Sequence, residues 1–168
     1  MKTTNIGING FGRIGRTLFR LLNDQEHLRV VAINDLADAR TLAHLLKYDS
    51  IHGTFQKEVG HTDNAILVEG QQIALLNRKS PKKIAWSAFD TDIVIECTGK
   101  FKTAKVLQNH ITNGAKKVIL SVPPADETIK MVVFGINESL ISEEDDIISN
   151  ASCTTNNAAP MIKVINDL

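Results

Sequence analysis

The sequence predicts an α/β protein with a doubly wound, mostly parallel sheet, helices on both faces and a small antiparallel excursion. Three observations indicate this fold class. Apolar strand-like runs alternate with segments of helical periodicity, a glycine-rich turn joins the first strand to the first helix, and several strands are apolar throughout. Strands without polar alternation are typical of a parallel sheet that is covered on both sides.

The first half of the fold follows from this alternation. Residues 4–9 form a short apolar strand, and residues 13–22 carry apolar side chains at the spacing of a helix. Residues 28–34 are rich in Val and Ile and predict the second strand. Residues 38–47 place their leucines on one helical face and predict the second helix.

The middle of the chain, residues 49–77, departs from the alternation. It is punctuated by glycines and contains two short strand-like pieces, at residues 65–68 and 73–76. We therefore expect loops and small antiparallel strands here, as an excursion from the main sheet.

The second half resumes the alternation and ends in a helix. Ser152 or Thr154 is available to cap this last helix, and Pro160 inside it indicates a bend or a helix that is held by packing. With the first two strands, the expected elements give six parallel strands in two halves. They are strands at 91–97, 117–122, 130–135 and 147–149, and helices at 103–113 and 152–167.

Composition and charge narrow the class of protein. Apolar residues make up 43% of the chain, enough for a folded core, and 19 basic residues balance 19 acidic ones. Neither nucleic acid nor a membrane is an expected partner, because the net charge is zero and no apolar run reaches the roughly 18 residues of a membrane span. Met1 and Lys2 lead into the first strand without a signal-peptide pattern, so we expect a cytoplasmic protein without a structural disulfide.

The turn after the first strand has the sequence G-x-G-x-x-G, from Gly10 to Gly15. Gly10 permits a sharp turn, Gly12 lets a pyrophosphate approach the backbone, and Gly15 lets the helix pack against the strand. The N-terminus of the helix offers free N–H groups and the positive end of its dipole to phosphates. In this strand–turn–helix context, the turn predicts a dinucleotide site.

Asp35 ends the second strand, 20 positions after Gly15. A carboxylate there can accept hydrogen bonds from both ribose hydroxyls and would repel a 2′-phosphate, which favours NAD over NADP. The alternative interpretation is that Asp35 only caps the helix that follows.

Cys153 lies within Ser-Asn-Ala-Ser-Cys-Thr-Thr-Asn, residues 149–156, at the expected start of the last helix. A helix N-terminus stabilises a thiolate, so Cys153 is a candidate nucleophile, which beside a nicotinamide indicates covalent oxidation of an aldehyde. Cys97 ends an apolar strand and is interpreted as a small buried hydrophobic residue. No histidine lies near Cys153 in the sequence, so the general base is not identified.

Together these motifs resemble the N-terminal, NAD-binding (Rossmann) half of the phosphorylating glyceraldehyde-3-phosphate dehydrogenases. The octapeptide around Cys153 resembles the active-site signature of that family and is highly specific. The resemblance covers the whole chain but only the N-terminal half of the family's usual length. Further stretches that resemble the family are residues 5–16, 34–36, 45–53, 96–101 and 114–118.

The resemblance implies NAD as the cofactor, no metal, and a role for each matching residue. Cys153 would be the nucleophile, with Ser152 and Thr154 holding the substrate beside it. Arg78 would lie near the adenine, although residues 78–81 read Arg-Lys-Ser-Pro where the family has Arg-Asp-Pro. The cofactor-binding residues would be Gly10, Gly12, Arg13, Ile14, Gly15, Asp35, Arg78, Thr98, Gly99 and Ser121. The family's activating histidine lies downstream of the cysteine, in the catalytic domain.

The implied reaction is the NAD-dependent oxidative phosphorylation of glyceraldehyde 3-phosphate to 1,3-bisphosphoglycerate in glycolysis, by a homotetramer. Two alternatives stay open: an erythrose-4-phosphate dehydrogenase, and a non-catalytic NAD-binding module. Residues 1–151 would form the NAD-binding domain, and residues 152–168 would begin the catalytic domain. By itself, the chain is expected to bind NAD without turnover. It is also expected to self-associate or to loosen its last helix, because a domain-packing surface would be exposed.

Overall fold

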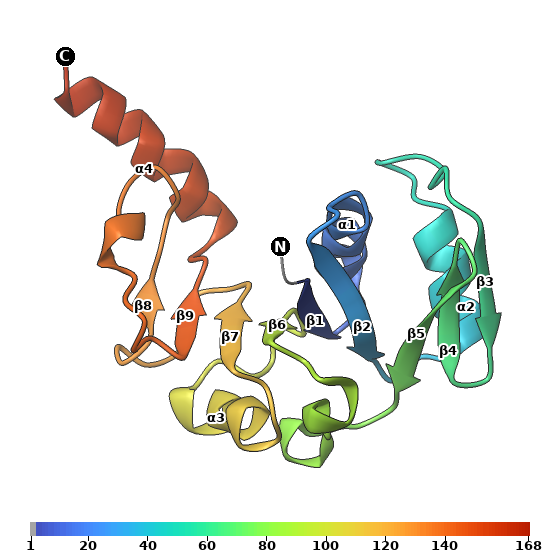
Figure 1. Cartoon of the computed structure of the whole chain (residues 1–168). Helices are drawn as coiled ribbons and strands as arrows, with labels where there is room; N and C mark the ends of the chain where they lie inside the picture. Colours follow the sequence, from blue (N-terminus) through green and yellow to red (C-terminus); the bar gives the residue numbers. More distant parts are fainter. Residues whose placement is uncertain (1–2) are drawn as a thin grey trace.

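The computed structural model describes residues 3–168, which form one nine-stranded sheet with helices on both faces (Figure 1). In chain order, the strands are β1 (Thr4–Asn9), β2 (Leu28–Asn34), β3 (Val59–Thr62), β4 (Ala65–Val68), β5 (Gln71–Leu76), β6 (Ile93–Glu96), β7 (Lys117–Leu120), β8 (Lys130–Met131) and β9 (Ile147–Ser149). The helices are α1 (Arg13–Leu22), α2 (Ala39–Lys47), α3 (Ala104–Thr112) and α4 (Cys153–Asn166), with short 3-10 helices η1 (Pro81–Lys83), η2 (Trp86–Phe89) and η3 (Glu138–Leu140).

The strand order across the sheet is β3-β4-β5-β2-β1-β6-β7-β9-β8. Across the described residues, the pairings are parallel from β5 through to β8, and those of β3–β4 and β4–β5 are antiparallel. The order reverses between β1 and β6, which is where a doubly wound sheet opens a crevice at the carboxyl ends of its strands. The predicted fold class is therefore confirmed.

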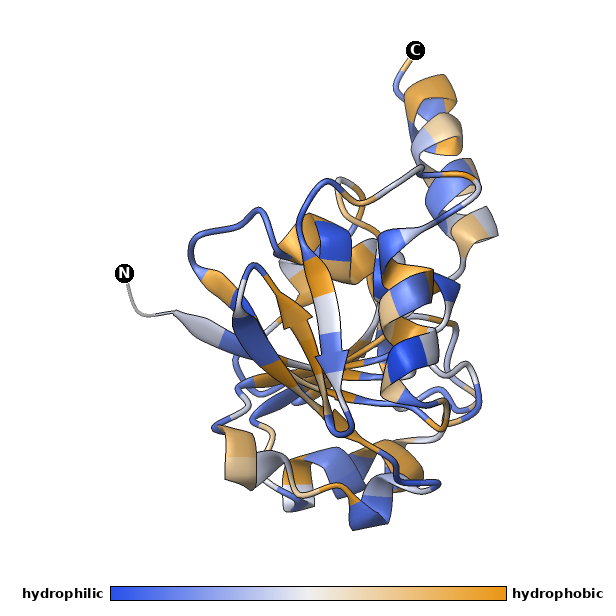
Figure 2. Ribbon diagram, turned by 90° about the vertical axis from the view of Figure 1, so that its right-hand side faces the viewer, coloured by the Kyte–Doolittle hydropathy of each residue, from blue (hydrophilic) through white to orange (hydrophobic). Residues whose placement is uncertain are grey.

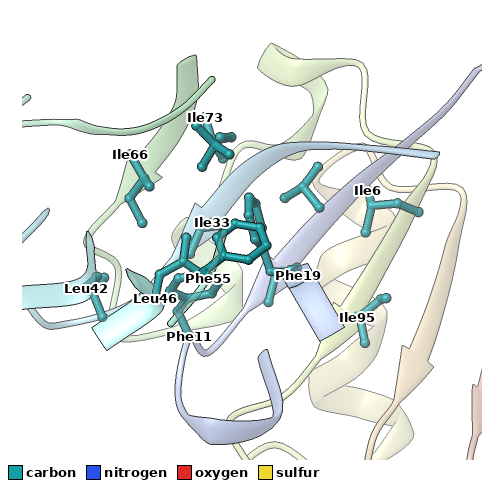
Figure 3. Close-up of a cluster of buried hydrophobic side chains, with 13 residues drawn as sticks. Ile6, Phe11, Phe19, Ile33, Leu42, Leu46, Phe55, Ile66, Ile73 and Ile95 are labelled. Carbon is teal, nitrogen blue, oxygen red and sulfur yellow. The ribbon is translucent and has the colours of Figure 1, made fainter. Parts of the chain in front are cut away.

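The core on the side of α1 and α2 is built around three aromatic rings (Figure 3). Phe19 on α1 packs edge-on against Phe11 and Phe55, with centroid distances of 5.7 and 6.5 Å. The Arg20 guanidinium lies 5.3 Å from the centre of the Phe55 ring and donates a 2.6 Å hydrogen bond to the carbonyl of Leu46. This arginine thereby ties α1 to the C-terminal end of α2.

The core on the opposite face is covered by α3 and the short helices η1 and η2 (Figure 1). Trp86 of η2 is fully buried there. It packs directly on β1, where a Cβ added to Gly7 would lie 2.6 Å from the indole ring. A glycine inside this strand therefore makes room for the largest side chain of the core.

Two expected elements differ in the structure. The piece at residues 73–76 belongs to β5, which pairs in parallel with β2, so it is part of the main sheet rather than of an excursion. The strand expected at residues 130–135 ends at Met131. Val132 and Val133 are buried, but the Val133 N–H donates to the side chain of Asn137 (2.7 Å), so the chain turns instead of extending the ladder.

Helix α4 projects from the body of the molecule (Figure 2). Ser152 caps it by accepting a 2.9 Å hydrogen bond from the N–H of Thr155. Of the two residues predicted as possible caps, Ser152 and Thr154, the structure therefore uses the first. The helix runs through Pro160 and buries none of its residues: Ala158, Ala159 and Pro160 are half-buried, and the residues from Met161 onward are exposed. Among residues 3–168, no helix combines the length and apolarity that crossing a membrane requires.

Candidate functional site

All the residues predicted for cofactor and substrate binding lie at one edge of the sheet. They follow the carboxyl ends of its parallel strands, which Figure 1 shows as the arrowheads. The glycine turn follows β1, Asp35 follows β2, and Arg78 comes after β5. Thr98 and Gly99 follow β6, Ser121 follows β7, and Ser152, Cys153 and Thr154 come after β9. This edge is where doubly wound sheets bind their ligands.

The glycine turn has the geometry that its sequence predicts. Gly10 has φ +92°, and a Cβ there would lie 2.7 Å from the backbone N of Thr98. A Cβ on Gly15 would lie 2.3 Å from the carbonyl oxygen of Gly10. A Cβ on Gly12, by contrast, would meet no described atom within 4 Å. The space above Gly12 is therefore open to a ligand, while Gly10 and Gly15 are required by the protein itself.

The first turn of α1 carries the two exposed residues Arg13 and Ile14. Its N-cap, Gly12, provides no side-chain cap for the helix. The N–H groups at this end are therefore left to a ligand or to water, in the way that helix N-termini bind phosphates.

The Asp35 carboxylate joins β2 to the glycine turn. Its Oδ2 accepts a 2.7 Å hydrogen bond from the N–H of Phe11, and its Oδ1 accepts a 3.0 Å bond from the N–H of Ala37. The helix after it is capped by Asp38, which accepts from the N–H of Thr41, so Asp35 is not that cap. A carboxylate can accept about four hydrogen bonds, so two acceptor positions remain for a ligand.

A row of three buried polar side chains crosses the middle of the sheet beneath this edge. Asn34, Asn9 and Glu96 end β2, β1 and β6, and they lie in register with one another. Asn34 donates to Asn9 (2.7 Å), and Asn9 donates to Glu96 (2.5 Å). Sequence analysis missed this row, although one signal was present: each of these three apolar strands ends in a residue that can hydrogen-bond.

The ends of this row hold two of the predicted cofactor-binding residues. The side chain of Asn34 accepts from the N–H of Arg78 (2.8 Å) and donates to its carbonyl (2.9 Å), which leaves the arginine side chain exposed. Glu96 accepts from the N–H of Thr98 (2.8 Å) and from its hydroxyl (2.5 Å). The next residue, Gly99, adopts φ +68°.

Ile14 and Ser121 line a common apolar pocket of about 320 Å³ between α1 and the ends of β6, β7 and β9. Cys97 lines the same pocket. Burial raises the pKa of the Cys97 thiol to about 12, against the opposing effect of a hydrogen bond with Ser121, and the nearby charge of Glu96 raises it further. Cys97 is therefore a protonated thiol at neutral pH, in keeping with its interpretation as a packing residue.

The turn that carries Cys153 is anchored to the end of β7. The N–H of Asn150 donates to the carbonyl of Leu120 (2.9 Å), directly before Ser121. Ala151 is buried with φ +56°, a conformation that side chains other than glycine rarely adopt. Cys153 then opens α4 with an exposed side chain. The anchor places it at the same edge of the sheet as the glycine turn.

The hydrogen bonds around this turn fix the start of α4. Asn156 donates its side-chain N–H to the carbonyls of Asn150 (2.7 Å) and Ser152 (3.0 Å). The Ser152 hydroxyl serves as the helix cap and also contacts the Thr155 hydroxyl at 2.7 Å. Thr154 is exposed beside the cysteine. Cys153 thus occupies the first position of a capped helix, where the helix dipole favours negative charge.

A larger pocket, of about 600 Å³, lies at the opposite end of the strands. It is lined mostly by polar residues around the start of β2, including Asp24, Arg29 and Lys57. None of the predicted site residues contributes to it. The candidate site is therefore assigned to the carboxyl edge because of the residues that lie there, and not because of the size of its pocket.

Comparison with known proteins yields one family model and many relatives. Residues 4–104 match the model described as "Glyceraldehyde 3-phosphate dehydrogenase, NAD binding domain". The chain is 47% identical over 164 residues to a glyceraldehyde-3-phosphate dehydrogenase of Mycoplasma pneumoniae, covering 98% of the chain and 49% of that protein. It is 49% identical over 164 residues to one from Bacteroides fragilis, covering 96% and 49%. The chain spans about half the length of the curated relatives it matches.

Proposed function

Because this chain belongs to the glyceraldehyde-3-phosphate dehydrogenase family, we propose that it supplies the NAD site and the nucleophilic cysteine of a phosphorylating aldehyde dehydrogenase. The family and the cofactor expected from the sequence are confirmed by this membership. The observation that carries the proposal is the common edge of the sheet on which the glycine turn, Asp35 and Cys153 all lie. We further propose that residues 1–151 form the NAD-binding domain and that residues 152–168 begin the catalytic domain.

The carboxyl edge fits NAD in two respects. The open space above Gly12 admits a pyrophosphate to the N–H groups of Arg13 and Ile14 at the start of α1. The two free acceptor positions of Asp35 suit the paired hydroxyls of the adenosine ribose. Arg78, Thr98, Gly99 and Ser121 complete the proposed walls of the cofactor site, since they follow the neighbouring strands.

NAD, when bound, supplies the acceptor for a hydride. The Cys153 thiolate adds its electron pair to the aldehyde carbon of glyceraldehyde 3-phosphate, and the carbonyl oxygen takes a proton from the general base, which forms a thiohemiacetal. As hydride leaves that carbon, the base takes the hydroxyl proton back, which leaves a thioester on Cys153, and an oxygen of inorganic phosphate then attacks the thioester carbonyl. The C–S bond breaks, so that 1,3-bisphosphoglycerate and the thiolate are released. Ser152 and Thr154 are proposed to hold the substrate beside the sulfur.

The 168-residue polypeptide tested by itself is proposed to bind NAD without turning over substrate. The reason is the general base, which the family carries downstream of the cysteine. His110, the histidine of α3, is buried and hydrogen-bonded to Trp86 and Glu96 and is not available as a base. Calorimetric titration with NAD, beside an assay of NADH formation, tests the proposal. Robust turnover by this polypeptide, or a folded polypeptide that does not bind NAD, would contradict it.

The whole protein is proposed to act on glyceraldehyde 3-phosphate as a cytoplasmic homotetramer. The test is NADH formation by the full-length protein with glyceraldehyde 3-phosphate, phosphate and NAD. Erythrose 4-phosphate is the second candidate substrate, and a comparison of kcat/KM for the two aldehydes separates the candidates. A higher kcat/KM for erythrose 4-phosphate would replace the first assignment with the second.

A further inference from the structure

The buried row Asn34–Asn9–Glu96 is fully hydrogen-bonded, and its hydrogen bonds converge on the carboxyl group of Glu96. The indole N–H of Trp86 donates to Nδ1 of His110 (2.8 Å), and an indole can only donate. Nδ1 therefore carries no proton, and the proton on Nε2 of this neutral imidazole points to Glu96 at 3.2 Å. With Asn9 as a further donor, Glu96 receives hydrogen bonds on both oxygens and is satisfied as a carboxylate.

The two ends of the row terminate on two turns at the carboxyl edge of the sheet, one after β5 and the other after β6. At one end, Asn34 makes two hydrogen bonds with the backbone of Arg78. At the other end, Glu96 makes two hydrogen bonds with the backbone and hydroxyl of Thr98. Both turns are proposed walls of the NAD site. Their polar backbone groups thus bind inward to the row, while the Arg78 side chain stays exposed toward solvent.

We propose that Asn34, Asn9 and Glu96 are positioning residues that set the spacing of the Arg78 and Thr98 turns, and thereby the affinity for the adenosine half of NAD. The inference rests on the proposed function. None of the three side chains needs to touch the ligand: all are at least 96% buried, with exposures of 4%, 1% and 0%. The strands hold their own backbones in register, and the side-chain row extends this connection beyond the ladder, to Arg78 at one end and to Thr98 at the other.

The first test is Glu96→Gln, which changes the volume of the side chain little. The new amide NH₂ must face either the two donors of Thr98 or the donors of Asn9 and His110, so that donors oppose donors. Asn34→Ala removes both hydrogen bonds to Arg78 at the other end of the row. We expect each folded variant to bind NAD and ADP-ribose roughly tenfold more weakly, by a similar factor for both ligands.

A matched control separates positioning from general stability. Val118→Ala removes buried volume from β7 without touching the row, so it lowers the melting temperature through a cavity. We expect its affinity for NAD to stay within about twofold of the native value. The proposal is overturned if Glu96→Gln folds and binds NAD as tightly as the native chain does. It is also overturned if Val118→Ala, with the same loss of melting temperature as Glu96→Gln, weakens NAD binding by the same factor. If Glu96→Gln does not fold, Asn34→Ala decides by the same criteria.

A second measurement needs no variant. The N–H groups of Arg78 and Thr98 lie in turns but donate to buried side chains, whereas those of Lys79 and Gly99 donate no hydrogen bond within residues 3–168. In the native chain without NAD, we expect the first pair to exchange with solvent roughly tenfold or more slowly than the second. Equal exchange of both pairs before NAD is added would show that the row does not order the turns. A native chain that binds no NAD would instead refute the proposed function, and this comparison would still decide on the row.

Discussion

The Cβ position of Gly15 lies 2.3 Å from the carbonyl oxygen of Gly10, closer than any real side chain approaches a backbone atom. Gly15→Ala therefore forces α1 away from the end of β1. We expect this variant to lose about 1 to 3 kcal/mol of unfolding free energy, as overpacked sites do. Chemical denaturation of the native chain and the variant measures the difference.

Gly12→Ala is the counterpart of Gly15→Ala, because its new methyl group would occupy the space of the ligand and not that of the protein. An alanine there meets no described atom within 4 Å, and φ is −73°, which alanine adopts without strain. We expect a change of about 1 kcal/mol or less in unfolding free energy, as for other N-cap substitutions, but a drop of roughly tenfold or more in NAD affinity. A variant with unchanged affinity would show that the pyrophosphate does not pass over Gly12.

Asp35→Asn tests the choice between NAD and NADP. The variant keeps the size of the side chain but removes two acceptor positions and the charge that repels a 2′-phosphate. We expect NAD affinity to fall by roughly tenfold and the preference for NAD over NADP to shrink. Asp38→Asn removes one negative charge from the same loop while preserving the cap on α2, since Asn caps as well as Asp. This control should leave both affinities unchanged in calorimetry.

The two cysteines are predicted to differ in reactivity. Cys153 is exposed at a helix N-terminus, whereas burial raises the pKa of Cys97 to about 12. At pH 7 to 8, iodoacetamide should label Cys153 and leave Cys97 unmodified in the folded chain. Peptide mapping by mass spectrometry measures this, and Cys153→Ser should abolish labelling. Equal labelling of both thiols would contradict the raised pKa of the half-buried Cys97.

The same thiol makes stability depend on pH in a defined direction. Above pH 9 the unfolded chain loses the Cys97 proton, whose ordinary pKa is 9.0, but the folded chain keeps it up to about pH 12. The unfolded state then binds fewer protons, so unfolding free energy falls as pH rises from 9 to 12, by up to about 1.4 kcal/mol per pH unit. Cys97→Ala should remove this component, which appears as the difference between the two pH profiles. Parallel profiles would refute it.

Helix α4 gives the prediction on association. It buries no residue and exposes apolar side chains on much of its surface. They include Met161, Ile162, Val164 and Ile165, each more than half exposed. We expect the 168-residue chain to self-associate at high concentration, and Ile162→Lys combined with Ile165→Lys to shift it toward monomer in sedimentation velocity. Asn157→Lys, which adds charge to the same helix at a polar position, serves as the control.

Local sequence patterns predict the elements of this fold better than they predict its pairings. Helix α1 was predicted with its observed bounds, because apolar spacing and a glycine turn mark both what it packs on and where it begins. The parallel pairing of β5 with β2 was not predicted, since the pattern of a six-residue strand does not specify a distant partner. At residues 130–135, Val-rich sequence indicated a strand. The Val133 N–H donates to the side chain of Asn137 instead, and the strand ends at Met131.

The candidate site shows the same division. Gly12, Asp35 and Cys153 were singled out because each stands at a strand end or helix start that the sequence itself marks. The row that links Asn34 to Glu96 could not be assembled this way. Asn34 lies 25 positions after Asn9 in the chain, and Glu96 lies 87 positions after Asn9. The strand order is what makes the three residues neighbours. Site residues that touch a ligand are thus easier to predict than those that position them.

The two outer strands of the sheet decide what form of assembly is open to the chain. At one edge β3 has four residues, and at the other β8 has two. The β8 edge also carries Lys130, whose ammonium bonds Asp145 at 2.7 Å and lowers the pKa of that carboxyl to about 2. Short edge strands resist the addition of strands from another molecule, and a charged side chain such as Lys130 adds to this effect. Strand addition at either edge is therefore disfavoured, and the exposed apolar side chains of α4 are the surface through which we expect copies of this chain to associate.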